Sequence, residues 1–172
     1  MKRMTSRTAL PRRGFLYGAA ASLALAGCGF QLRKAPDFAF SSISVPGNTA
    51  FANYLRRNLR AAGTVQVLPA DQADQAEAVF EILGENRENI VISTNASGQV
   101  RELNLRLTIR FRVRGQNGKE LMGPTAIQQT RDITYNETAA LAKEGEAELL
   151  FRDMQTDIAQ QILRRLAAIK PA

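Results

Sequence analysis

The alternation of apolar and polar side chains is longest between residues 103 and 114. Every second position is apolar, and the positions between them are polar or positively charged. Strict alternation of this length predicts a β-strand in a sheet with one buried face and one face in water. The apolar positions are Leu103, Leu105, Leu107, Ile109, Phe111 and Val113, and the polar ones are Asn104, Arg106, Thr108, Arg110, Arg112 and Arg114.

Two further long strands are expected next to this one in the sequence, over residues 78–93 and 120–135. Segments rich in glycine and asparagine at 95–98 and 115–118 predict the turns between the three strands. The pair Gly123-Pro124 predicts an interruption of the last strand, because proline cannot donate a hydrogen bond to a central ladder.

Shorter elements are expected before and within these strands. Residues 38–45 and 64–68 predict two short strands, and the polar, alanine-rich residues 69–77 predict a loop. Residues 84–87 interrupt the apolar pattern of the first long strand with a glycine and polar side chains, and they predict a bulge or bend there.

Two segments have the spacing of amphipathic helices. In the first, Asn48 or Thr49 can cap the start, apolar residues follow at steps of three and four, and Gly63 is a natural C-terminal stop. The second begins after Asn136 as N-cap and extends almost to the end of the sequence. Its apolar stripe consists of Leu150, Met154, Ile158, Ile162 and Leu166.

The order strand, helix, strands, helix predicts an α+β fold. The economical architecture is a two-layer sandwich, in which two helices pack on one face of a four- to five-stranded, mostly antiparallel or mixed sheet. Residues 38–172 have the length of a single domain.

The N-terminal region has the three parts of a lipoprotein export signal. A basic head is followed by an apolar run at 15–26, which ends in two small residues directly before Cys28. We expect residues 1–27 to be removed, Cys28 to carry a covalent lipid, and 28–37 to form a tether. The alternative is a small buried cysteine next to a core helix. Arg12-Arg13 leaves both the general and the twin-arginine export routes open.

The high positive charge belongs mainly to this signal. The chain has 23 Lys and Arg against 16 Asp and Glu, a net charge of +7. Five of those bases and none of the acids precede Cys28, which leaves 18 against 16 in the mature chain. So small an excess does not favour nucleic-acid binding, which requires a basic domain.

The sequence offers little for catalysis. It contains no histidine, and its single cysteine is the expected lipid attachment site, so the commonest general base, metal ligand and thiol nucleophile are missing. We therefore expect a protein that is not an enzyme and has no cofactor or metal beyond the lipid on Cys28.

The arginines of the alternating strand are the candidate binding groups. Guanidinium groups match the geometry of phosphate and carboxylate. A row that includes Arg101, Arg106, Arg110 and Arg112 would suit an anionic partner. The alternative is a solvated sheet face, where arginine is common.

Several segments, in this order, resemble the LptE family of lipoproteins. The resemblance covers nearly all of the mature chain, and it rests on Cys28-Gly29-Phe30-Gln31-Leu32-Arg33, on the strand end 130–136, on 140–144, on Asp153-Met154 and on 160–166. It implies an outer-membrane lipoprotein on the periplasmic side, with a sheet and two packed helices. It also implies a plug inside the LptD β-barrel that helps the barrel assemble and takes part in delivering lipopolysaccharide to the outer leaflet.

The resemblance also implies lipopolysaccharide-contact residues. Lys143 matches a family lysine implicated in that contact, whereas the basic residue expected in the turn between two central strands is replaced here by Ala96-Ser97-Gly98. Arg101 is the nearest substitute. With Arg106, Arg110 and Arg112 added from the alternating strand, the suspected contact set is Lys143, Arg101, Arg106, Arg110 and Arg112. The alternative function is a non-catalytic lipoprotein of another outer-membrane or transport complex, without lipopolysaccharide binding.

Overall fold

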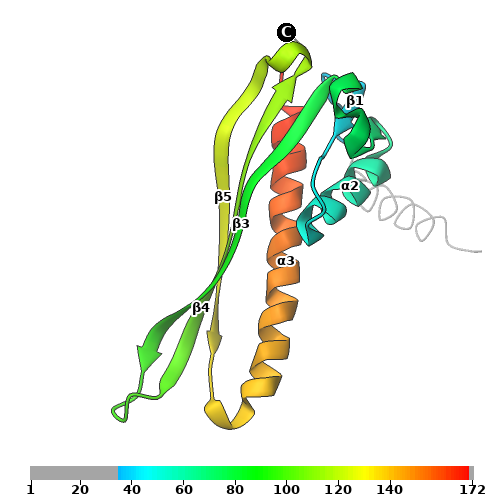
Figure 1. The fold of residues 1–172 in the computed structure, drawn as a ribbon. Coiled ribbons are helices and arrows are strands. Elements are labelled where there is room, and N and C mark those ends of the chain that lie inside the picture. Colours follow the sequence, from blue (N-terminus) through cyan, green and yellow to red (C-terminus); the bar gives the residue numbers. More distant parts are fainter. Residues whose placement is uncertain (1–34, 171–172) are drawn as a thin grey trace, which may run out of the picture. The chain divides into compact units, whose positions relative to one another are not determined.

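Five strands form one mixed sheet in the computed structural model, which describes residues 35–170 apart from the side chain of Asn117 (Figure 1). The strand order is β2-β1-β3-β4-β5; β1 runs parallel to both of its neighbours, and β3, β4 and β5 are antiparallel. The expected α+β class is confirmed. The strands are β1 Ser42–Ser44, β2 Gln66–Leu68, β3 Ala78–Thr94, β4 Val100–Gly115 and β5 Glu120–Thr134.

Strand β4 has the two faces that its alternation predicts. The side chains of Leu105, Leu107, Ile109, Phe111 and Val113 are all completely buried, whereas the positions between them are partly or fully exposed. The Phe111 ring stacks on that of Phe80 in β3, with their centroids 4.8 Å apart. The apolar face of the long strands therefore forms one side of the hydrophobic core.

Helix α2, Ala50–Ala62, begins and ends where the sequence predicts. The Thr49 hydroxyl accepts a hydrogen bond from the N–H of Ala52 at 3.1 Å. Gly63 ends the helix in the left-handed conformation at φ 70°, which glycine adopts without strain. Three large apolar side chains, Phe51, Leu55 and Leu59, are completely buried.

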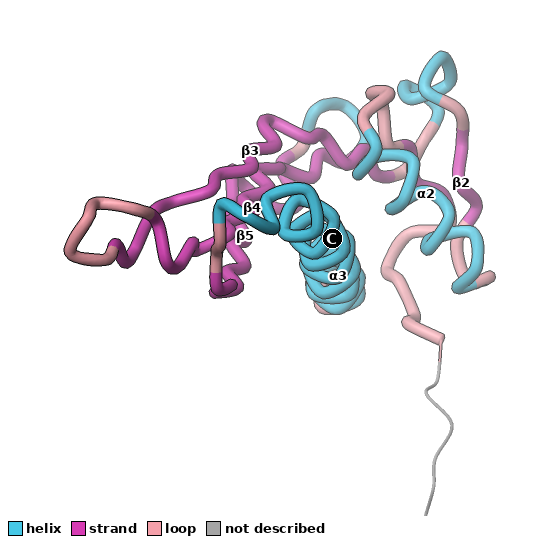
Figure 2. Tube along the Cα trace, turned by 90° about the horizontal axis from the view of Figure 1, so that it is seen from below, coloured by secondary structure: helices cyan, strands magenta, loops and turns pink. Residues whose placement is uncertain are grey.

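Helix α3, Ala140–Ala167, runs along the apolar face of the sheet (Figure 2). A short 3₁₀ turn, Glu137–Ala139, precedes it, and the Asn136 side chain caps this turn by accepting from the N–H of Thr138. The apolar stripe of α3 from Met154 to Leu166 belongs to the same buried cluster as the apolar side chains of α2 and β4. The Tyr54 hydroxyl donates to Thr156 at 3.0 Å and links the two helices. No helix in this part of the chain is both long enough and apolar enough to cross a membrane.

The early part of the chain is less regular than its sequence predicts. Strand β1 covers only the end of the expected segment 38–45, because the backbone N–H of Ser41 donates to the Glu77 carboxylate at 2.7 Å. The expected loop 69–77 contains a 3₁₀ segment, Ala70–Gln75. The expected signal 1–27, Cys28 and all but the last three residues of the tether 28–37 lie outside the described residues.

The expected interruption at Gly123-Pro124 is limited to the pairing, because β5 itself continues through both residues. The pairing of β5 with β4 shifts between Met122 and Thr125, so both residues fall within an irregularity. Strand β5 is the edge of the sheet, where a missing N–H breaks no ladder on its free side.

Candidate functional site

The outer sheet face, which carries Arg106, Arg110, Arg112 and Arg114 of β4, faces away from the buried cluster. It is not a row of free cations. Arg112 Nε donates to one carboxylate oxygen of Glu81 at 2.5 Å, and Arg114 binds the other oxygen. Burial of the Glu81 carboxyl acts to raise its pKa, but hydrogen bonds and positive charge from the two arginines outweigh burial and lower that pKa.

A second acid of β3 lies beside another arginine of this face. Glu88 is directly opposite Arg106 in the sheet, with 3.9 Å between Oε2 and Nη1. The register also places Glu81 opposite Arg112. Two acids of the neighbouring strand therefore offset three of the four arginines, which the sequence interpretation did not foresee.

Arg110 differs from the other three arginines of the outer sheet face. Its cross-strand neighbours are Gly84 on β3 and Ala126 on β5, neither of which has a polar side chain. The Arg110 side chain is exposed and makes no hydrogen bond or ion pair with any part of residues 35–170. It is therefore the arginine of this face that is free to bind an anion from outside the chain.

Lys143 and Arg101 lie near each other in the fold, at the end of the sheet where α3 begins. The Lys143 ammonium donates to the Thr134 hydroxyl at 3.1 Å and to Glu146 at 2.8 Å. The carbonyl of Arg101 accepts from the N–H of Tyr135, the residue after Thr134, at 2.7 Å. The structure thus brings these two suspected residues to one end of the molecule and leaves Arg106, Arg110 and Arg112 along the strand.

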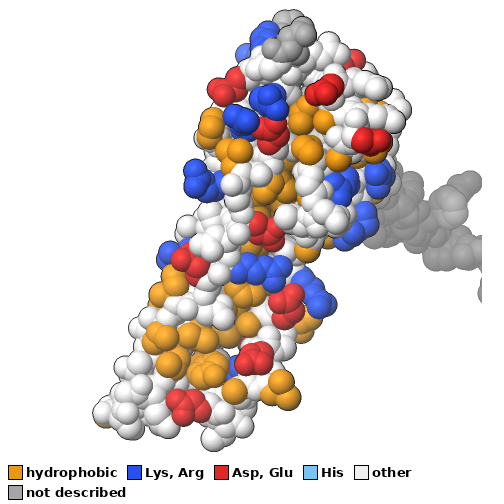
Figure 3. Space-filling view, in the orientation of Figure 1, with side chains coloured by type: hydrophobic (Ala, Val, Ile, Leu, Met, Phe, Trp, Pro, Cys, Tyr) orange, Lys and Arg blue, Asp and Glu red, His pale blue; other side chains and the backbone are white. Residues whose placement is uncertain are grey.

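The same end carries exposed apolar side chains. Leu141 is 84% and Leu149 60% exposed on α3, and Val91 and Ile92 are about half exposed near the end of β3. In Figure 3 apolar side chains gather over the lower half of the face shown, where the β3–β4 turn and the first turns of α3 lie. The sequence carried a signal for this surface, because Leu141 and Leu149 lie off the buried stripe of α3.

The described residues offer no cluster of side chains for metal-dependent catalysis. Among residues 35–170, no group of three or more Asp, Glu, His or Cys side chains is placed to hold a metal ion. The outer sheet face offers cations and hydrogen-bond donors. The end of the sheet where α3 begins adds an exposed apolar surface beside Lys143 and Arg101. This combination would suit an anionic or amphipathic partner.

Comparison with known proteins identifies the family. The family model described as "LptE: Lipopolysaccharide-assembly" matches residues 40–166, and the chain belongs to that family. It is 28% identical over 159 residues to an LPS-assembly lipoprotein LptE of Yersinia pestis, covering 88% of this chain and 74% of the relative. The match is to an assembly family and not to an enzyme family, as expected from the sequence.

Solved structures of lipoproteins share the fold. Lipoprotein B of Nitrosomonas europaea superposes with a TM-score of 0.69 at 31% identity, over 81% of this chain and 91% of the other. The rare lipoprotein B of Shewanella oneidensis gives a TM-score of 0.62 at 28% identity, over 74% and 94%. The expected resemblance to LptE is therefore confirmed by the family model and the curated relative, and the fold is shared with solved lipoproteins.

Proposed function

We propose that this protein is an outer-membrane lipoprotein, anchored through Cys28 on the periplasmic side, that plugs an LptD-like β-barrel and helps it assemble. In that complex it takes part in delivering lipopolysaccharide to the outer leaflet. The match of residues 40–166 to the lipopolysaccharide-assembly family carries the proposal, because it supports a role in lipopolysaccharide transport. The lipoprotein names of its relatives support a place in the cell envelope.

The outer sheet face supports the role as a plug. The interior of a large membrane barrel is polar, so a protein inside it needs a polar surface without large unpaired charge. Ion pairs to Glu81 and Glu88 give the outer sheet face that character. The exposed Arg110 guanidinium remains to bind a carboxylate of the barrel wall.

Co-purification with the barrel from detergent-solubilised outer membranes tests this role. Arg110→Glu should reduce recovery of the barrel at least tenfold, because the reversal replaces an attraction with like-charge repulsion at the contact. Arg110 has no partner within the described chain, so the variant should keep the stability of the parent. Arg112→Glu is unsuitable, since it would place a second carboxylate against Glu81.

The matched control is Arg164→Glu, the same reversal at an exposed position of α3. Like Arg110, the Arg164 side chain makes no hydrogen bond or ion pair within residues 35–170. Equal recovery of the barrel with both variants would show that the outer sheet face does not contact the wall. Failure of the unaltered protein to recover any barrel would instead support the alternative, an interaction lipoprotein of another complex.

Lipopolysaccharide binding is tested separately at Lys143. Lys143→Gln removes the positive charge without placing a carboxylate beside Glu146, as Lys143→Glu would. We expect it to weaken binding of purified lipopolysaccharide several-fold, by the loss of one charge-assisted contact. Unchanged binding by both this variant and Arg101→Gln would remove this end of the molecule from the proposal.

A further inference from the structure

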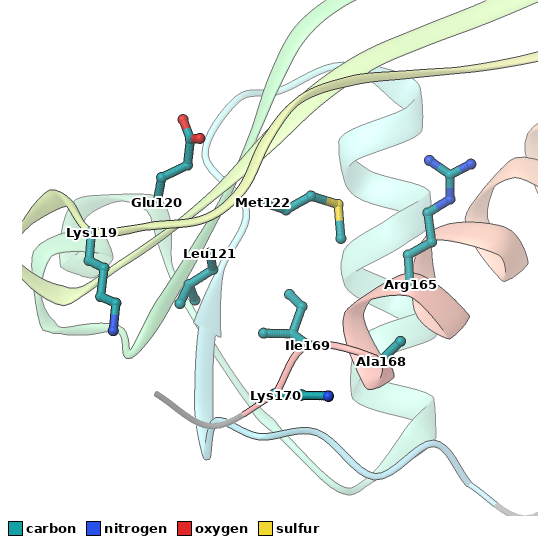
Figure 4. Close-up of a pocket in the computed structure, with 8 residues that line it drawn as sticks. All are labelled: Lys119, Glu120, Leu121, Met122, Arg165, Ala168, Ile169 and Lys170. Atoms are coloured by element: carbon teal, nitrogen blue, oxygen red, sulfur yellow. The ribbon is translucent and has the colours of Figure 1, made fainter.

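A groove lies at the opposite end of α3 from Lys143, where the helix ends beside the start of β5 (Figure 4). Its volume is about 560 Å³, and its floor is formed by Leu121, Met122 and Ile169. A smaller pocket of about 220 Å³ shares Leu121 and Ile169 with it and continues to Phe40. The two hollows together form one apolar trough between the β4–β5 turn and the end of the helix.

Three cations surround this trough. Lys119, Arg165 and Lys170 line it, and all three are exposed. Within residues 35–170 none of their side chains makes a hydrogen bond or an ion pair, in contrast to the arginines bound to Glu81. Two carboxylates also line the trough, Glu120 in the groove and Glu77 in the smaller pocket, so the cations exceed the acids by one. The three cations also outweigh the partial negative charge at the C-terminal end of α3.

An apolar floor with a cationic rim fits an amphiphile that has an anionic head and a hydrocarbon tail. The tail can cover the partly buried side chains of Leu121, Met122 and Ile169, and the head can be bound by the lysines and the arginine. A soluble anion would use only the rim and leave the floor in water. The composition of the groove therefore favours a lipid over a free phosphate or a carboxylate.

The length of the tether brings a membrane surface within reach of the groove. Ala35 follows Cys28 by seven positions, and seven extended residues span at most about 25 Å. The described chain then continues to Ala39 and Phe40, which line the smaller pocket. A lipid anchor on Cys28 therefore holds this end of the domain close to the leaflet in which the anchor is embedded.

We propose that the groove docks an anionic phospholipid of that leaflet, with its headgroup between Lys119, Arg165 and Lys170 and part of an acyl chain on Leu121, Met122 and Ile169. The proposal rests on the lipid anchor of the proposed function, and it adds a second membrane contact that requires neither the barrel nor lipopolysaccharide. Such a contact would add to the anchorage that the lipid on Cys28 supplies.

The test uses the mature chain from residue 28 with Cys28→Ser, which carries no lipid. Its sedimentation is measured with vesicles of phosphatidylcholine alone and with vesicles of phosphatidylcholine and phosphatidylglycerol in equal parts. We expect binding to the anionic vesicles only. Arg165→Gln should weaken it by more than the roughly fivefold attributed to loss of one basic residue near an anionic surface.

Two further variants separate the groove from general charge attraction. Arg152→Gln, on the same helix, makes the same change in net charge and should weaken binding no more than about fivefold. Met122→Gln keeps all three cations and should weaken binding as well, because it places an amide on the apolar floor. Equal effects of the two charge removals, no effect of Met122→Gln, or no preference for anionic vesicles would each overturn the proposal.

These outcomes are distinct from those that test the proposed function. Vesicle binding by the lipid-free chain can fail while the barrel is still recovered in full, which would refute only the groove. Conversely, loss of barrel recovery would leave vesicle binding untouched.

Discussion

The Glu81 carboxylate accepts hydrogen bonds from two arginines and is only 18% exposed. Because its pKa in the folded protein is lower than the ordinary value of 4.5, the folded state favours its ionised form. This contribution to stability is therefore complete above about pH 4.5 and is lost as the pH falls through the lower folded-state pKa.

Glu81→Gln should lower the free energy of unfolding at neutral pH by about 1 kcal/mol, after allowance for solvent around the two half-exposed arginines. The difference between parent and variant should narrow below pH 4.5, as the parent's carboxyl takes up a proton. Urea unfolding at a series of pH values measures it. Glu88→Gln is the control, with a smaller expected effect because its contact with Arg106 is 3.9 Å long. A difference independent of pH would contradict this account.

A single inserted residue explains why these ion pairs could not be predicted from the sequence. Strict alternation along β3 would place Glu81 and Glu88 on opposite faces. The register shifts between Ile82 and Gly84, so Leu83 is an extra residue and Glu88 joins Glu81 on the outer sheet face. The sequence predicted a bulge at 84–87, one residue further on, but it did not indicate which acids the bulge would bring beside the arginines.

The inner faces of β4 and α3 are the elements whose patterns the sequence shows most clearly. Six apolar positions at a period of two predicted the inner face of β4, and five at steps of four predicted that of α3. All of these residues lie in one apolar cluster. The caps Thr49, Gly63 and Asn136 were also predictable, because each acts through its own local backbone. Strands β1 and β2 were predicted too long, since their ends are decided by partners such as Glu77 that are distant in sequence.

Contacts between α3 and the strands beside β4 fix the position of that helix further. Arg87 of β3 pairs with Glu148 at 3.2 Å and lies over the Phe151 ring, and Arg131 of β5 pairs with Asp157 at 2.7 Å. Each pair is about one-third to one-half exposed, so neither contributes much free energy. Their contribution is to orientation, while the buried stripe provides the stability.

Phe111→Ala tests the packing of β4 against the rest of the core. The side chain is completely buried and stacked on Phe80, so its removal should cost about 3–5 kcal/mol of unfolding free energy. Thr108→Ala, on the outer sheet face of the same strand, should change that free energy by less than about 0.5 kcal/mol. Urea unfolding of the lipid-free mature chain measures both variants. A loss below about 1 kcal/mol for Phe111→Ala would mean that the core tolerates the cavity.

For the whole molecule, membrane attachment is the property on which the proposed function depends. Cys28→Ala should leave an unprocessed precursor or a soluble periplasmic form in place of an outer-membrane protein. Mass spectrometry of the mature N-terminus, together with membrane fractionation, measures both outcomes. A mature protein that begins at an unmodified Cys28 would contradict the anchor, whatever the fate of the variant.

The length of α3 sets a distance between the two ends of the domain. Lys143 and Arg165 are 22 residues apart in one continuous helix, which corresponds to about 33 Å along its axis. The hydrocarbon core of a bilayer is about 30 Å thick. In the plug that we propose, an upright α3 would therefore place Arg165 at the level of one layer of headgroups and Lys143 at the level of the other.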